Sequence, residues 1–273
     1  PTLDVGGSVG QLKNCHNIYI DENGFAYLAG CNVGGGGPIF LDLNQDLDEP
    51  VHVGQENANY AHDVFVQRDT LFASDIYRGQ VSIWDVHDKA NPVEIGRQET
   101  TSRFTHNAWA SEDGKYVFTT DERGRGKVDA YDITDLDNIL RLDAFRPAAT
   151  VDFDVIPHNT HYLNGYLIVS WYTDGVIIVD AHKPDNLIQV ANYDTWPGAD
   201  GGFGGCWGAF PFLPSGLILA SDIQTGLYVL DVDYVRACYL EGIVKDENSK
   251  TSLNNVTVKI SSPVKNVKVS NLL

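Results

Sequence analysis

Histidine recurs along this sequence, and each recurrence directly precedes asparagine or aspartate. The four pairs begin at His16, His62, His106 and His158, with 44–52 residues between successive pairs. Neutral imidazole binds Zn, Cu, Fe and Ni, and carboxylates beside such rings can orient them or can coordinate Mn or Ca directly. The repetition therefore predicts a divalent metal site, with the four histidines as candidate ligands and Zn, Cu, Mn and Ca as candidate ions.

Carboxylates recur at other fixed places in the same repeat. One aspartate directly follows a repeated histidine, three aspartates end the second apolar run of their units, and a glutamate follows one of these three. They are Asp63, Asp75, Asp121, Asp222 and Glu122. We expect them beside the histidines, where they orient the rings or act as a general base. The fifth unit has Gly208 or Ala209 at the histidine position, which leaves room for a water or a substrate on the metal.

Each histidine opens a unit of three or four short apolar runs, and Gly, Asn and Asp separate these runs. Such runs, rich in β-branched and aromatic residues, predict strands. A unit of this length with three or four strands is typical of a β-propeller blade. Helical repeats are excluded because no unit shows apolar residues at helical spacing. We predict an all-β propeller with about five visible blades, because the alternative, a large β-sandwich, would not explain the recurring histidine.

The inner strand of each propeller blade lines the central channel, so equivalent positions form a ring. The repeat therefore places the histidines and the carboxylates near one mouth of the channel. Another interpretation needs no metal: histidine beside Asp or Asn can join adjacent blades by hydrogen bonds, since buried polar groups need partners. The residues leave both interpretations open. His52, His87 and His182 do not repeat, and we expect them at the surface.

A further aspartate ends the third run of every unit, and it is expected to cap a turn through its side chain. These residues are Asp42, Asp85, Asp132, Asp180 and Asp231.

The four cysteines suggest one or two disulfides. Cys15 and Cys31 flank one predicted hairpin and lie almost opposite each other, so they are the leading pair, and Cys206 with Cys238 is the second candidate. Sequence alone allows three connectivities. Three aromatic residues, Trp171, Tyr172 and Trp207, fall near the predicted mouth. They can stack on a sugar or a peptide, or they can belong to the packing between blades.

Composition restricts the partners. The net charge of −18 disfavours nucleic acid and anionic lipid, and no run of about 18 apolar residues predicts a membrane span. The glycine-rich segments 34–37 and 201–205 lack the pattern of a phosphate loop, so we expect no nucleotide.

The chain divides near Cys238. Residues 240–273 carry a charge of +2, with five Lys against three acids, whereas residues 1–239 carry −20. We predict a propeller over residues 1–238 and a partial β-sandwich over residues 239–273. Residues 2–5 suggest the last strand of another blade, so we expect a separate N-terminal segment to complete the propeller.

Several motifs occur in the order found in one known family. They are His16-Asn17, Tyr60-Ala61-His62-Asp63, Thr105-His106-Asn107-Ala108-Trp109, Thr120-Asp121-Glu122, Pro157-His158-Asn159 and the segment 208–216. Over roughly residues 12–235 the chain resembles the choice-of-anchor B family, which is related to LVIVD-repeat propellers. The tail resembles the start of a carboxypeptidase-regulatory-like domain, a module that often follows secreted domains in Bacteroidetes. The resemblance implies a secreted or surface-attached bacterial propeller with no established activity.

The function we expect is that of an extracellular or cell-surface binding or scaffold protein, with a cell-surface protein or glycan as partner and a possible metal at the channel mouth. The alternatives are a metal-dependent enzyme that uses the His/Asp cluster and a purely structural component of a surface assembly. No nucleophile motif is present, so the sequence favours a binding protein over an enzyme. It identifies no catalytic residue.

Overall fold

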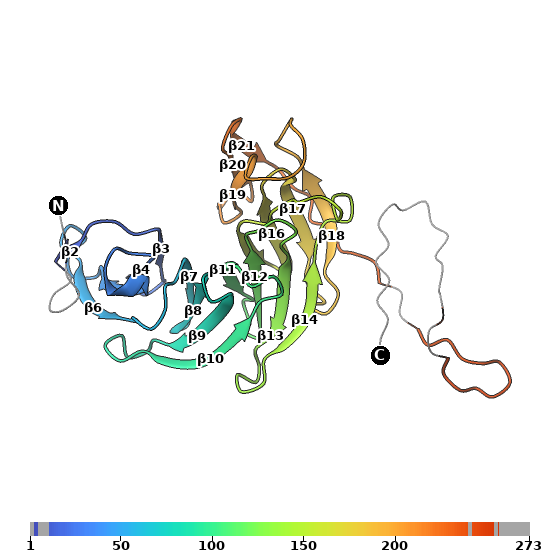
Figure 1. Cartoon of the computed structure of the whole chain (residues 1–273), viewed down its shortest axis with the longest axis horizontal. Coiled ribbons are helices and arrows are strands. Elements are labelled where there is room, and N and C mark those ends of the chain that lie inside the picture. The colour runs from blue at the N-terminus through green and yellow to red at the C-terminus, as the bar shows by residue number, and fades with distance from the viewer. Residues whose placement is uncertain (1–2, 5–10, 240–241, 254–255, 257–273) are drawn as a thin grey trace.

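The computed structural model describes residues 3–4, 11–239, 242–253 and 256. These residues form an all-β fold with five successive antiparallel sheets in a β-propeller arrangement, which confirms the predicted fold class. The sheets follow one another along an arc, from the blue sheet with β3 and β4 to the orange sheet with β19–β21 (Figure 1).

Four sheets have four strands each, connected in sequence order. The first contains β3 (Asn17–Ile20), β4 (Phe25–Ala29), β5 (Ile39–Asp42) and β6 (Val51–Gln55). The second contains β7 (Asp63–Gln67), β8 (Thr70–Asp75), β9 (Gln80–Asp85) and β10 (Val93–Glu99). The third contains β11 (Thr105–Ala110), β12 (Tyr116–Asp121), β13 (Val128–Asp132) and β14 (Leu140–Phe145). The fourth contains β15 (Thr160–Leu163), β16 (Tyr166–Trp171), β17 (Gly175–Asp180) and β18 (Ile188–Tyr193).

The fifth sheet has three strands, β19 (Cys206–Phe210), β20 (Ile218–Asp222) and β21 (Gly226–Leu230). Near the N-terminus, β1 (Leu3–Asp4) pairs with β2 (Gln11–Leu12) in a separate two-stranded sheet. A single 3-10 turn, η1 (Gly34–Gly36), is the one helical element among the described residues. No helix in this part of the chain has the length and apolarity needed to cross a membrane.

The core lies between the sheets, because the internal strands of the first four sheets bury both of their faces. In β16, Leu167 and Val169 pack with Phe118 of the third sheet, whereas Ile168 packs with Ile218 of the fifth. Successive side chains of a strand point to opposite faces. The continuous apolar runs in the sequence therefore produce a row of sheets with an apolar layer between neighbours.

The aspartate that ends the third strand caps the following turn, as expected. Its Oδ1 accepts the backbone N–H two residues later in four sheets, over distances of 2.9–3.0 Å; the residues are Asp42, Asp85, Asp132 and Asp180. In the fifth sheet, Asp231 instead accepts from the next residue, Val232. These short-range bonds fix the outer turns.

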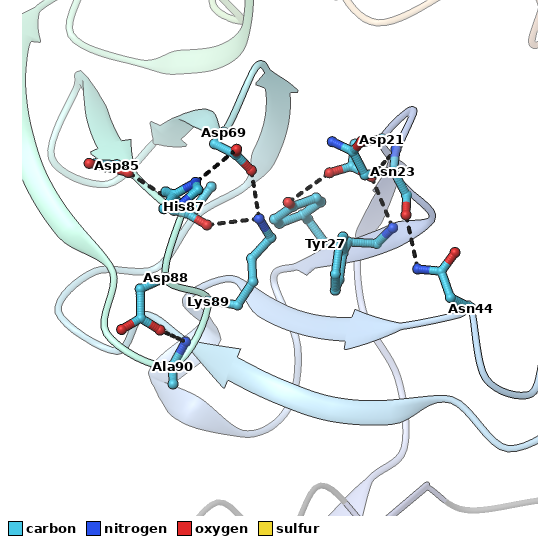
Figure 2. A network of polar contacts seen from close by, with 12 residues as sticks. Asp21, Asn23, Tyr27, Asn44, Asp69, Asp85, His87, Asp88, Lys89 and Ala90 are labelled. Carbon is cyan, nitrogen blue, oxygen red and sulfur yellow. Dashed lines mark hydrogen bonds and ion pairs between the residues drawn. The ribbon is translucent and has the colours of Figure 1, made fainter.

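A lysine joins the first two sheets at these turns (Figure 2). Lys89 Nζ donates to Asp69 Oδ1 at 2.8 Å and to the carbonyl of Val86, and it lies 4.8 Å from the centre of the Phe25 ring. The exposed ring of His87 also contacts Asp69, which agrees with the predicted surface position of this histidine.

The first predicted disulfide is present, and the second is not. Cys15 and Cys31 are bonded. Cys206 and Cys238 are free thiols. Cys206 is buried on β19, where its Sγ contacts the carbonyl of Gly208 at 3.4 Å, whereas Cys238 is exposed. The proposed pairing of these two cysteines is therefore wrong.

The predicted C-terminal module stays a prediction. Between residues 242 and 253 the structure has one isolated bridge, Lys245 with Ser252, around a turn capped by Asp246. The C-terminal strand expected over residues 255–260 falls almost entirely outside the described residues, as do residues 2 and 5 of the strand expected over residues 2–5.

Candidate metal site

The repeated histidine has the same backbone environment in three sheets. Its N–H donates to a carbonyl near the end of the second strand, over 2.8–2.9 Å: His16 to Ala29, His62 to Ser74 and His158 to Ser170. His106 lies inside β11. Because each histidine occupies the same position in its sheet, the imidazoles of successive sheets lie next to one another.

The four imidazoles form a continuous row, which we call the histidine row: His16, His62, His106 and His158. Successive ring centres lie 4.0, 4.3 and 4.2 Å apart, and the rings are tilted by 45–54°. Trp207 of the fifth sheet continues the row, 4.9 Å from His158. The repeat had predicted that these histidines come together at one mouth, and the structure places them in contact.

The residue after each of the first three histidines joins neighbouring sheets. Asp63 accepts a hydrogen bond from the side-chain amide of Asn17 on one side and from that of Asn107, at 2.8 Å, on the other. Asn107 Oδ1 in turn accepts the backbone N–H of Thr160 at 2.9 Å. The Asn and Asp side chains thus make sheet-to-sheet bonds, and hydrogen bonds of the His62, His106 and His158 rings with the backbone of His106, His158 and Trp207 also link neighbouring sheets.

The carboxylates expected beside the histidines are divided between two roles. Asp75, Asp121 and Asp222 each accept bonds from the segment that leads into their own sheet: from Asn59, from Thr100, Ser102 and Phe104, and from Thr195. Asp75 also accepts from Gln80 at the start of β9, and Asp222 from Gln224 and Thr225 in the turn before β21. Each is buried. They hold these segments in place, and none of them contacts an imidazole of the row in these bonds.

Glu122 is the carboxylate that reaches the row. It follows the last residue of β12, where its backbone N–H donates to Phe104 O at 3.2 Å. Its Oε2 lies 3.5 Å from His106 Nε2, and its Oε1 lies 3.8 Å from His158 Nε2. Tyr172 directly follows β16 in the next sheet and donates its hydroxyl to Glu122 Oε1 at 2.6 Å. Equivalent turns of adjacent sheets therefore supply a carboxylate and the phenol that orients it.

Two groups of three donors have the spacing that a metal ion requires. One contains His106, Glu122 and His158, and the other contains His16, His62 and His106; within each group the donor atoms lie within 4.8 Å of one another. His106 belongs to both. Each group therefore has the donor types and the spacing to hold an ion.

Burial keeps the imidazoles neutral. It lowers the pKa of His158 to about 3 and the pKa of His62 to about 4, and it places the pKa of His106 well below the ordinary value. Neighbouring histidines of the row lower these pKa values further. A metal binds the neutral ring, so His62, His106 and His158 are in their ligand form at neutral pH. Burial also raises the pKa of Glu122, while the Tyr172 hydroxyl opposes this shift.

The three aromatic candidates have different positions. Trp171 is fully buried and packs edge-on against Phe145, so it belongs to the core and is unable to stack on a ligand. Tyr172 is buried and bonded to Glu122. Trp207 is half-exposed against His158, and it alone retains a surface for stacking.

Sequence reasoning missed the pairing of Tyr172 with Glu122. The signal was present, since Tyr172 follows Trp171 as Glu122 follows Asp121, each directly after the second strand of its unit. Matching these positions between neighbouring units predicts that the two side chains meet.

No family model matches this chain, and no curated protein matches it. Solved structures share its fold. A Bacteroides uniformis protein provisionally described as a 6-phosphogluconolactonase has a TM-score of 0.59 and 14% identity, covering 89% of this chain and 73% of its own. A Lactobacillus plantarum protein has a TM-score of 0.62 and 14% identity, covering 86% and 68%. The periplasmic gluconolactonase of Pseudomonas aeruginosa has a TM-score of 0.59 and 13% identity, covering 90% and 76%. At such identity the likeness establishes the β-propeller fold alone.

Proposed function

We propose that this protein is a metal-binding β-propeller in which His106, Glu122 and His158 hold one divalent transition-metal ion. One observation supports the proposal above the others: two imidazole nitrogens converge on one carboxylate that a buried phenol already orients. Metal-ligating groups in proteins are typically held in this way by a further hydrogen bond.

The donor chemistry favours Zn²⁺ and its neighbours over Ca²⁺ or Mg²⁺. Two nitrogens and one carboxylate oxygen match the ligand sets of zinc sites, whereas the alkaline-earth ions prefer oxygen alone. Among the Mn, Ca, Zn and Cu ions considered from sequence, Zn and Cu suit imidazole best. The side chains of His106 and His158 are both 4% exposed and that of Glu122 is 15% exposed, so water competes weakly for the ion.

Calorimetric titration with Zn²⁺ tests the proposal. We expect one tight equivalent in the full chain, a large loss of affinity in Glu122→Gln and His158→Ala, and unchanged binding in the control His87→Ala, whose ring is exposed and outside the row. Binding that is weak in the parent protein, or equally tight in all four proteins, would contradict the proposal. The row would then be a packing feature of a structural propeller.

A second candidate function is a metal-dependent enzyme. Three protein donors leave a fourth position of a tetrahedral ion free, which catalytic zinc sites need and structural ones lack. Glu122 would then act as a ligand, and a bound water would supply the nucleophile. Hydrolysis of ester or lactone substrates by the Zn²⁺-loaded protein, lost in His106→Ala, would support this candidate. Equal turnover by the metal-free protein would exclude it.

We also propose an extracellular or cell-surface location and membership of the choice-of-anchor B family. The Cys15–Cys31 disulfide supports the location, because disulfides persist in oxidising compartments. The order of the His-Asn and His-Asp motifs supports the family. Half-exposed Trp207 beside the site suits stacking on a cell-surface glycan or protein. Fractionation of the producing cells tests the location, and recovery of the protein from the cytoplasm would contradict it.

The two ends of the arc support the proposal that a further β segment completes the propeller. Ile18 and Ile20 are exposed on β3, and Phe210, Leu227 and Val229 are exposed on the fifth sheet. Equivalent faces between internal sheets are buried, so these suit another sheet of the same kind. Hydrogen exchange of this chain tests whether the fifth sheet lacks a neighbour. Equal protection of the amides in β19–β21 and in β15–β18 would contradict the proposal.

A further inference from the structure

His106 is shared by two ligand sets of different chemistry. The inner set, His106, Glu122 and His158, contains a carboxylate. The outer set, His16, His62 and His106, contains imidazole alone. Because one residue belongs to both, an ion can pass from one set to the other while it keeps one protein ligand throughout.

Burial increases along the histidine row. His16 is exposed, His62 is half-buried, and His106 and His158 are buried. Beyond His158, the Trp207 ring covers the row at 4.9 Å, and on another side the Tyr172 ring lies 5.2 Å away. The row is therefore accessible at the His16 end, whereas aromatic rings cover the inner set.

We infer that His16, His62 and His106 form a second metal-binding set, which captures a divalent transition-metal ion from solvent and transfers it to the inner set through His106. This inference rests on the proposed function of the inner set. It adds a second site and a route of entry, which a buried metal site requires.

The chemistry of the two sets gives the transfer a direction. Three neutral imidazoles bind Zn²⁺, Cu²⁺ or Co²⁺ without neutralising its charge. In the inner set Glu122 supplies a negative charge in a buried place, where Coulomb attraction is stronger than at the surface. In the proposed transfer, Glu122 and His158 replace His16 and His62 as ligands, and His106 is common to both sets. The ion thus moves towards the site that binds it more tightly.

Co²⁺ reports on the two sets separately, because its visible absorption depends on its ligands. We expect the parent protein to bind one equivalent. His158→Ala should retain one weaker equivalent with an altered spectrum, which marks the outer set. His106→Ala should bind none, because both sets lose a ligand. His87→Ala serves as the control, and near-ultraviolet circular dichroism checks that each variant is folded.

The rate of loading tests the transfer. In stopped-flow mixing with Co²⁺, His16→Gln should load several-fold more slowly than the parent protein, yet reach the parent spectrum and the parent affinity at equilibrium. His16 is exposed, so this variant has little reason to misfold.

Three results would overturn the inference: loading of His16→Gln at the parent rate, absence of Co²⁺ binding in His158→Ala, or two equivalents bound at once by the parent protein. These results are distinct from failure of the proposed function, which would appear as a parent protein that binds no Co²⁺ or as a Glu122→Gln variant with unchanged affinity.

Discussion

The hydroxyl of Tyr172 donates a hydrogen bond of 2.6 Å to Glu122 across the boundary between the third and fourth sheets. Both residues directly follow the second strand of their sheets. The bond occupies one carboxylate oxygen, Oε1, while Oε2 lies 3.5 Å from the His106 ring. The packing of the fourth sheet against the third therefore positions the Glu122 carboxylate in the candidate metal site.

Removal of that hydroxyl should weaken metal binding without unfolding the protein. For Tyr172→Phe we expect a decrease in Zn²⁺ affinity of about 10- to 100-fold, the usual effect of losing a group that orients a ligand. Calorimetry measures the decrease, and Tyr77→Phe, at a tyrosine that is 77% exposed, is the matched control. Equal affinity in the two variants would mean that Tyr172 does not orient Glu122.

The Asn–Asp–Asn network should stabilise the fold independently of any metal. Asp63→Ala removes the acceptor shared by Asn17 and Asn107, and we expect it to lower the free energy of unfolding by about 1–3 kcal/mol, the cost of leaving buried donors unpaired. Urea unfolding of Asp63→Ala, Asn107→Ala and the double variant measures the coupling. Strictly additive effects would show that the two residues act separately.

The repeat in the sequence was sufficient to predict the fold and the histidine row. Each histidine occupies one place in a unit with strand periodicity, and identical places in successive blades must meet. The roles of the carboxylates were not predictable in the same way. Asp75 and Asp121 occupy matching positions, but the side chains that bond to them differ, Gln80 at Asp75 and Thr100 at Asp121. Burial of Trp171 depends on a neighbouring sheet, which a single unit does not reveal.

The contribution of the buried histidines to the stability of the metal-free protein should fall as the pH decreases from about 6.5 towards 4. Burial lowers the folded-state pKa of His62 to about 4 and that of His158 to about 3, both below the ordinary histidine pKa of 6.5. The folded state therefore disfavours the proton that the unfolded chain binds, and the stabilising contribution of the neutral rings is present above pH 6.5. It is lost as the pH falls towards the folded-state pKa values.

Buried Asp63 and Asp75, whose pKa values are raised to about 6, act in the opposite direction. Their contribution is present below the ordinary aspartate pKa and is lost as the pH rises through about 6. The histidine contribution is isolated by comparison: His158→Gln, measured by urea unfolding in chelator at pH 7 and 5, should lose less stability than the parent. The exposed control His87→Gln should match the parent, and equal losses in all three proteins would contradict the assignment.

The disulfide should contribute measurably to stability. Cys15 and Cys31 are 16 residues apart, and closing a loop of this size contributes about 3 kcal/mol in the chain-entropy account. We expect the Cys15→Ser/Cys31→Ser variant to unfold at lower urea concentration and to become insensitive to reductant. Cys238→Ser, at an exposed free thiol, should behave as the parent protein does in both respects.

X-ray absorption at the zinc edge of the protein loaded with one equivalent tests the central claim most directly. The account predicts two imidazole nitrogens at about 2.0–2.1 Å and a carboxylate oxygen at about 2.0–2.2 Å from the ion, with the oxygen contribution altered in Glu122→Gln. A coordination shell of water oxygens alone, or a spectrum unchanged in both Glu122→Gln and His158→Ala, would contradict it.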